Sequence, residues 1–405
     1  MVYAFFVVSA VLIAGFIASV LLIKYGIPDS MFLIGLGILI GPVFKLLDTS
    51  EFVTLAPYIG ALALVAIMFE SSLGINLHEL IETARPAVML ALLSFFLSMS
   101  VSAAFVHFIL DIPWIYSILY GSIVGGSSGA VVAAMATKIG LSGSIGLILS
   151  LESILTDVFC IVSSLVVLMI LVSPLTGIAA TPEQIGGFVA SKFSVSIILG
   201  FVCGLVLSSI LYKVRKYKHI YTAVFATLIF LYAITEFLAG SGAIAVLTAG
   251  IILANLEHMP SFLSSEEKTE TLRFQRVFLE SFHSELTLLI KVFFFVVVGL
   301  MINVENPFNL LLAAILSILF LLVRFPATYV ITKLARLGKM APIMTVFYGR
   351  GLAAAVLVFI AIDTLNGSIP KPEFFLESVS GIVLITNVIL TVGATLLRRR
   401  FHMAY

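Results

Sequence analysis

Apolar stretches of membrane-spanning length follow one another along almost the whole chain, and they limit the possible folds more than any other feature. A helix that crosses a bilayer needs about 20 consecutive, mostly apolar residues. Thirteen such runs are separated by short polar segments, at about 4–23, 31–47, 52–70, 86–110, 114–137, 145–172, 186–211, 219–238, 241–256, 284–303, 307–332, 341–362 and 375–396. The sequence therefore predicts an all-α, multi-pass membrane protein with about 13 transmembrane helices.

The composition argues against other classes of protein. Hydrophobic residues make up 61% of the 405 residues and charged residues only 11%, whereas soluble domains are roughly 45–50% apolar and about 25% charged. Strands of a porin-type barrel alternate apolar and polar residues, but run 86–110 is apolar on every face. A net charge of +1 gives no basic surface for nucleic acid. We expect no nucleic-acid partner and no cofactor.

The basic residues orient the chain, because cytoplasmic loops of membrane proteins are enriched in Lys and Arg. With thirteen spans, the loops on one side contain only Lys45, Lys192 and Lys371. The other side contains Lys24, Arg85, Lys138, Lys213, Arg215, Lys216, Lys218, Lys268, Arg273, Arg276, Lys333, Arg336, Lys339, Arg398, Arg399 and Arg400. This asymmetry predicts a plasma-membrane protein with its N-terminus outside and its C-terminus in the cytoplasm.

The two halves of the chain contain similar segments in the same order. IGLGILIG in the second run resembles TAGIILAN in the ninth, and GGSSGAVVAAM in the fifth resembles YGRGLAAAVLV in the twelfth. Transporters often contain such repeats, with the substrate site near the midplane at interrupted helices. We expect one membrane transport domain over 1–405, with repeat one at about 31–172, a linking helix at about 186–211, and an inverted repeat two at about 219–396.

Glycine-rich segments predict where two spans are interrupted. Residues 125–129 read GGSSG in the fifth span, and residues 349–351 read GRG in the twelfth. Each glycine weakens a helix by about 1 kcal/mol relative to alanine, and broken backbone is not stable in contact with lipid. We expect both segments to be buried in protein or to line a wet cavity. The alternative is that the glycines only allow close helix packing.

Ionisable side chains inside the membrane are the candidates for function. Asp157 lies about twelve residues into the sixth span, and Ser153 shares its helix face. Together with Ser127, Ser128 and free carbonyls of the fifth span they would form an oxygen-rich pocket suited to a monovalent cation. A desolvated carboxylate also favours the protonated form. On another face, Glu152 could pair with Arg324 or Arg350, and a structural ion pair is the alternative role for all these residues.

Other charged residues lie nearer to the ends of the spans. We expect Lys291 to extend to the cytoplasmic face and Glu236 and Asp363 to be solvated near the outer ends. Residues 257–283 include SSEEKTETLRFQRVF, in which acidic residues precede basic ones at helical spacing. This pattern predicts a short cytoplasmic amphipathic helix.

Several of these segments together resemble one family. The residues Glu152-Ser153-Ile154-Leu155-Thr156-Asp157 resemble the E-S-x-x-N-D signature of the monovalent cation/proton antiporter superfamily, in its sodium/proton exchanger branch. GRGLAAA at 349–355 is similar to its G-x-R-G-L-A-A-A element. Phe69-Glu70 with Leu73 resembles F-E-G-G-L, and 294–300 resembles F-F-V-x-x-G-L. The similarity extends over essentially the whole chain.

The resemblance implies a fold, an assembly and a set of site residues. It implies the sodium/proton antiporter fold and a homodimer in which a core bundle moves relative to a dimerisation bundle. It also implies that Asp157 alternately binds a cation and a proton and that Arg324 pairs with Glu152. Two positions depart from the family pattern: Ser127-Ser128-Gly129 replaces T-D-P, which removes a second carboxylate, and Thr156 replaces an asparagine. The predicted cation- and proton-binding residues are Asp157, Ser153, Glu152, Ser127, Ser128 and Thr156, with Asp157 and Ser153 as ligands of transported Na⁺; the predicted structural ion pair involves Glu152, Arg324 and Arg350.

The predicted function is secondary-active exchange of Na⁺, Li⁺ or K⁺ for protons, in the service of pH homeostasis. Competition for the single carboxylate of Asp157 predicts electroneutral, one-for-one exchange. The alternatives are a K⁺ efflux channel or transporter unit and a transporter of another small solute, such as an organic anion bound by the arginines. An intramembrane enzyme is disfavoured because Asp157 is the only aspartate predicted at mid-depth and no histidine accompanies it.

Overall fold

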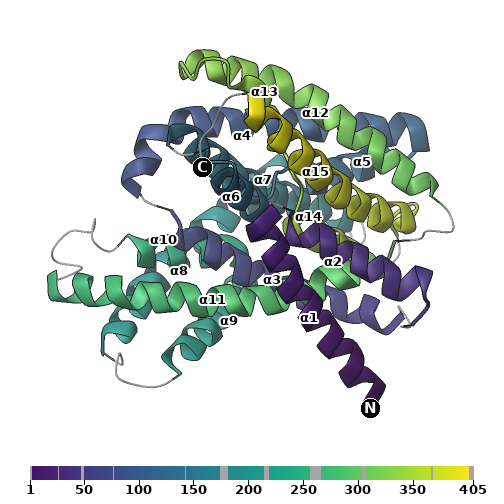
Figure 1. The fold of residues 1–405 in the computed structure, drawn as a ribbon. Coiled ribbons are helices and arrows are strands. Elements are labelled where there is room, and N and C mark those ends of the chain that lie inside the picture. The colour runs from purple at the N-terminus through teal and green to yellow at the C-terminus, as the bar shows by residue number, and fades with distance from the viewer. Residues whose placement is uncertain are drawn as a thin grey trace. The chain divides into compact units, whose positions relative to one another are not determined.

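The computed structural model describes residues 2–25, 27–46, 50–75, 77–141, 143–173, 181–213, 219–255, 266–302, 307–365 and 368–400. These residues form helices joined by short turns, and they contain no strand (Figure 1). The elements are α1 (Val2–Tyr25), α2 (Asp29–Ile38), the π-helical turn η1 (Leu39–Val43), α3 (Ser50–Leu73), α4 (Leu77–Leu110), α5 (Trp114–Val124), α6 (Gly129–Lys138), α7 (Ser144–Val172), α8 (Pro182–Lys213), α9 (Ile220–Phe237), α10 (Gly242–Ala254), α11 (Glu266–Leu300), α12 (Phe308–Leu334), α13 (Ala341–Val346), α14 (Leu352–Thr364) and α15 (Pro372–Arg400).

The helices confirm the prediction of a multi-pass, all-α membrane protein. Among the described residues, eight helices are long and apolar enough to cross a membrane, and five shorter apolar helices accompany them. Each of the thirteen predicted spans overlaps one of these helices, and the fifth and twelfth spans are each divided between two helices. The apolar side chains that argue against a soluble fold thus lie on helices. The backbone groups of a helix form hydrogen bonds within the helix itself, as a bilayer requires.

The chain divides into two compact units. The first unit consists of Met1–Gly60, Thr83–Ala179 and Lys291–Tyr405, and the second of Ala61–Glu82 and Ala180–Ile290. Helices α3, α4 and α11 contribute residues to both units. The predicted single transport domain and its two inverted repeats stay predictions.

In the first unit, α7 and α15 each contact both interrupted spans. Helix α7 packs against α5, α6 and α14, while α12 and α15 lie side by side (Figure 1). Helix α7 has 29 residues, which gives a length of about 44 Å and exceeds the roughly 30 Å hydrocarbon core. Its apolar residues Leu149 and Ile161 are buried, as is Val356 of α14. Residues near the middle of α7 are therefore enclosed by protein.

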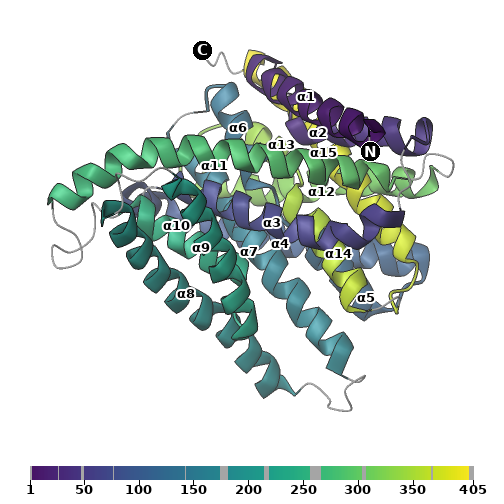
Figure 2. The same ribbon diagram turned by 90° about the horizontal axis from the view of Figure 1, so that it is seen from below.

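In the second unit, α8, α9 and α10 pack together (Figure 2). Lys192 of α8 is buried, and its Nζ lies 3.1 Å from Oε2 of Glu236 and donates to the Gly240 carbonyl. The other carboxylate oxygen, Oε1, accepts from the Gly242 amide at 2.8 Å. The Glu236 side chain is 35% exposed, as expected near the end of a span, but it also forms an ion pair that the sequence did not suggest. Its carboxylate neutralises Lys192 and satisfies the first amide of α10, which has no partner within the helix.

Helix α11 corrects the expectation of a separate helix within 257–283. The structure has one helix of 35 residues from Glu266 to Leu300, which joins the predicted amphipathic segment to the tenth span; residues 256–265 lie outside the described part of the chain. No glycine or proline occurs between residues 266 and 298. Since these are the residues that most readily end a helix, nothing in this stretch separates the two predicted elements.

Candidate ion-binding site

Two interrupted helices meet in the first unit. Helix α5 ends at Val124 and α6 begins at Gly129, while α13 ends at Val346 and α14 begins at Leu352. The glycines thus interrupt both spans where the sequence predicts. The Ser128 amide donates to the Gly349 carbonyl at 2.8 Å, so backbone groups that the interruption frees from their own helices bond each other. A β-carbon on Gly351 would lie 2.1 Å from Ser128 Oγ, and only glycine fits this crossing.

The first break, residues 125–128, also lies against α7. A β-carbon on Gly126 would be 2.8 Å from the Thr156 carbonyl oxygen. The Ser127 amide donates to Thr156 Oγ1 at 3.1 Å, and the two hydroxyl oxygens lie 3.3 Å apart. Thr156 in turn donates to the Ser153 carbonyl at 3.0 Å. The hydroxyl of Thr156 therefore supplies a partner for a backbone amide that would otherwise be unpaired inside the protein.

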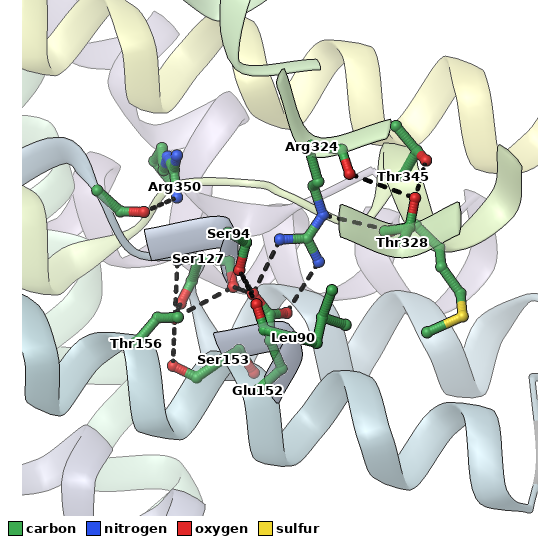
Figure 3. A network of polar contacts seen from close by, with 12 residues as sticks. Leu90, Ser94, Ser127, Glu152, Ser153, Thr156, Arg324, Thr328, Thr345 and Arg350 are labelled. Atoms are coloured by element: carbon green, nitrogen blue, oxygen red, sulfur yellow. Dashed lines mark hydrogen bonds and ion pairs between the residues drawn. The ribbon is translucent and has the colours of Figure 1, made fainter. Parts of the chain in front are cut away.

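Glu152 is held by four hydrogen bonds (Figure 3). Arg324 of α12 donates from both terminal nitrogens, each at 2.8 Å from one carboxylate oxygen. Ser94 of α4 and Ser127 donate to Oε1 at 3.0 and 3.2 Å. Glu152 is fully buried and Arg324 is 3% exposed. The hydrogen bonds of a buried carboxylate that is paired in this way offset its lost hydration and hold it in place.

Arg350 belongs to the second break, residues 347–351, and has different partners. Its guanidinium donates to the Gly125 carbonyl at 2.9 Å and lies 4.7 Å from the Phe320 ring centroid. Arg324, and not Arg350, is thus the partner of Glu152, and Figure 3 shows Arg350 apart from this pair. No ion pair within the described ranges includes Arg350. Its positive charge therefore faces the carbonyl end of α5 and an aromatic ring, both of which attract cations.

Asp157 lies one helical turn and one residue beyond Glu152 and is 8% exposed. Its carboxylate faces the backbone amide of Gly129, the first residue of α6, and the charged groups that act on it are Glu152 and Arg350. In the part of the chain that the structure describes, it forms no ion pair. Ser153, on the same face, is fully buried and donates to the Ser150 carbonyl at 2.8 Å. The hydroxyl proton is thereby used, and the oxygen lone pairs remain as acceptors.

The structure gives Lys291 a partner that the sequence did not suggest. Its Nζ lies 3.0 Å from Asp29 Oδ2, with 16% and 10% of the two side chains exposed. This ion pair accounts for the Lys291 ammonium group, and its extension to the cytoplasmic face stays a prediction. Asp29 lies in the polar segment before the second span, and its position beside an apolar run is the one sequence signal for this pair.

A comparison with known families agrees with this architecture. The model of a family described as "Sodium/hydrogen exchanger, transmembrane" matches residues 8–398. The chain belongs to the sodium/hydrogen exchanger family. This is a family of transporters, and the match confirms the family to which the sequence motifs point.

Individual relatives of this exchanger-family chain are distant. It is 23% identical over 159 residues to Na(+)/H(+) antiporter 1 of Methanocaldococcus jannaschii, a match that covers 39% of this chain and 37% of that protein. It is 25% identical over 264 residues to K(+)/H(+) antiporter NhaP2 of Shewanella sp. (strain ANA-3), with 62% and 44% covered. The matches thus span less than half the length of both curated relatives.

A solved structure supports the fold over the whole chain. The structure of the sodium proton antiporter MjNhaP1 from Methanocaldococcus jannaschii at pH 8 has a TM-score of 0.77 and 20% sequence identity with this exchanger-family chain. The match covers 99% of this chain and 97% of that chain. It confirms the predicted sodium/proton antiporter fold.

Proposed function

We propose that this chain is a secondary-active antiporter that exchanges Na⁺, Li⁺ or K⁺ for protons. One observation carries the proposal. Two carboxylates lie on α7, and Arg324 neutralises Glu152 while Asp157 has no basic partner in ion-pair contact among the described residues. A buried carboxylate without such a partner favours either a bound proton or a bound cation. Asp157 is therefore the group for which the two ions compete.

Competition for one carboxylate gives exchange without a further coupling device. When Asp157 holds a proton it lacks the charge that attracts a cation, and when it holds a cation the proton is excluded. Each passage across the membrane then moves one positive charge, which predicts electroneutral one-for-one exchange. Ser128, at the position where the family has a second carboxylate, is neutral, and this supports the same stoichiometry.

The remaining candidate residues have supporting roles in this proposal. Ser153 and the first break, with Ser127 and Ser128, supply neutral oxygens near the cation, since such hard ligands suit alkali ions. Thr156 holds the first break in place. Glu152 with Arg324 forms the structural ion pair that fixes α7 against α12, and Arg350 holds the two breaks together.

We also propose the setting in which this exchange takes place. The chain would form a homodimer in the plasma membrane, with its N-terminus outside, its C-terminus in the cytoplasm, and two inverted repeats that alternate access to Asp157. It would contribute to pH homeostasis and would have no enzymatic activity. The basic residues of the predicted cytoplasmic loops support the orientation, and membership of a transporter family supports the absence of catalysis.

The names of the relatives support both Na⁺ and K⁺ as candidate cations. One is named a Na(+)/H(+) antiporter and the other a K(+)/H(+) antiporter. The decisive experiment is a pH-gradient flux assay on the full chain in proteoliposomes, with Na⁺, Li⁺ and K⁺ added in turn. We expect proton flux only when a transported cation is present. Proton flux without a countercation, driven by voltage, would instead identify a channel.

A further inference from the structure

Two neighbouring residues of α15 bind both backbone groups of Arg350. The Arg350 amide donates to Thr386 Oγ1 at 2.9 Å, and Asn387 Nδ2 donates to the Arg350 carbonyl at 3.2 Å. Both side chains are fully buried. We call Thr386 and Asn387 the Arg350 clamp. Because Arg350 lies between α13 and α14, neither of its backbone groups has a regular helical partner, and the clamp replaces both.

The clamp also forms a hydrogen bond to α2. Asn387 Nδ2 donates to Ser30 Oγ of α2 at 3.0 Å, and Ser30 is fully buried. Asn387 Oδ1 has no hydrogen-bond partner among the described residues. A buried amide with an unpaired oxygen is costly, and an apolar residue would suit a membrane helix better. The polar contacts of Asn387 therefore account for its presence better than helix stability does.

The segment that the clamp holds, Gly349 and Arg350, is connected to the first break at two points. The Arg350 guanidinium donates to the Gly125 carbonyl at 2.9 Å. The carbonyl of the preceding residue, Gly349, accepts from the Ser128 amide at 2.8 Å. A displacement of the Arg350 backbone would consequently move the segment that carries Ser127 and Ser128.

We propose that Thr386 and Asn387 are positioning residues that hold the Arg350 backbone, and through it the first break, in the geometry that binds the transported cation. The inference rests on the proposed antiport function. Neither residue touches the cation in this proposal. Both act on the position of the oxygens around Asp157.

Thr391 provides a matched control on the same helix. Its hydroxyl donates to the Asn387 carbonyl at 2.8 Å, which is a bond within α15. Thr386 makes the same kind of bond, to the Ile382 carbonyl at 2.7 Å, but in addition accepts from Arg350. Thr391→Val and Thr386→Val therefore remove the same intrahelical bond, and only the second removes a partner of the break.

The first measurement is independent of transport. Hydrogen–deuterium exchange of the full chain in lipid nanodiscs, followed in peptides that contain residues 349–352, reports the loss of the acceptor of the Arg350 amide. We expect Thr386→Val to accelerate exchange there about fivefold, the factor for one net hydrogen bond. Thr386→Ser retains the acceptor. The single variants Thr386→Ser and Thr391→Val should both exchange as the wild type does. Unchanged exchange in Thr386→Val would overturn the clamp.

The second measurement tests the positioning role in proteoliposomes. We expect the apparent KM for Na⁺ to rise about fivefold in Thr386→Val and in Asn387→Leu, with a smaller change in maximal rate, because binding geometry is what the clamp sets. Thr386→Ser should restore the wild-type KM. If Asn387→Leu does not fold, Ser30→Ala removes one contact of Asn387 without altering α15 and should raise KM less. If hydrogen exchange is accelerated but the KM is unchanged in every variant, the positioning role is overturned. If the wild-type protein shows no cation-dependent proton flux, the antiport proposal itself is overturned.

Discussion

The surroundings of Glu152 and of Asp157 differ sharply, although the two carboxylates lie five residues apart on one buried helix. Around Glu152, an arginine and two serines donate four hydrogen bonds. Around Asp157, the backbone amide of Gly129 faces the carboxylate and the charge of Arg350 acts on it, but no basic side chain forms an ion pair with it among the described residues. Burial alone therefore does not identify a transport residue. What separates the two carboxylates is whether a positive partner is built in.

The largest expected effect separates the two carboxylates by function. Asp157→Asn keeps the size of the side chain but removes the negative charge, so we expect cation-dependent proton flux to fall to background, a loss of more than about 100-fold. Flux in proteoliposomes and thermal unfolding of the same preparation measure the two properties. A folded Asp157→Asn protein that still exchanges cations for protons would remove Asp157 from the mechanism.

The next largest effect concerns the stability that the Glu152 ion pair provides, which Asp157 does not share. Arg324→Met leaves Glu152 buried and unpaired, which should destabilise the protein by about 3–5 kcal/mol and reduce the yield of folded material. The double variant Glu152→Leu with Arg324→Met should recover most of this loss, because an apolar pair of similar size is often neutral. Size-exclusion profiles and thermal unfolding in detergent provide the measurement. A single variant as stable as wild type would show that the pair is dispensable.

The pH dependence follows from the unpaired carboxylate. At lower pH a proton occupies Asp157 more often, so the apparent KM for Na⁺ should rise with acidity, by about tenfold for each pH unit where the protonated form dominates. The maximal rate at saturating Na⁺ should change less. Initial rates over a range of Na⁺ concentrations at several pH values test this. An apparent KM that is independent of pH would rule out competition at one site.

The smallest effect concerns a single neutral donor. Ser94→Ala removes one of the hydrogen bonds to Glu152 and should cost about 1 kcal/mol of stability, while transport is retained. The matched control is Ser102→Ala, since that hydroxyl donates to the Ser98 carbonyl of its own helix at 2.6 Å. A loss of flux in Ser94→Ala with normal stability would indicate that Glu152 takes part in ion binding and would weaken the contrast with Asp157.

Features that depend on local sequence could be predicted well. Apolar runs predict the spans because each residue contributes to membrane partition independently of its distant neighbours. The glycines at 125–129 and 349–351 predict the two interruptions because they weaken any helix in which they occur. Asp157 and Glu152 could be predicted as site candidates because an ionisable side chain at bilayer depth is costly and is usually paired or functional.

Features that depend on packing could not be predicted from the residues alone. The residues alone left both Arg324 and Arg350 as possible partners for Glu152, and only the family resemblance pointed to Arg324, because the choice depends on where α12 lies against α7. The partners of Lys291 and Glu236 could not be predicted for the same reason, because Asp29 and Lys192 are distant in the sequence. Thr386 and Asn387 gave no signal at all, since single polar residues are common in membrane helices.

The hydrogen bond between the Ser128 amide and the Gly349 carbonyl has a consequence for biogenesis. Synthesis proceeds from the N-terminus, so the first break is made well before its partner exists. Contacts between residues so far apart in the chain form late, after a large loss of chain entropy. Until α13 and α14 are inserted, the backbone groups of the first break have to form hydrogen bonds with water, lipid headgroups or an insertion factor. We therefore expect truncations that end before residue 349 to be degraded rather than to accumulate as stable half-proteins.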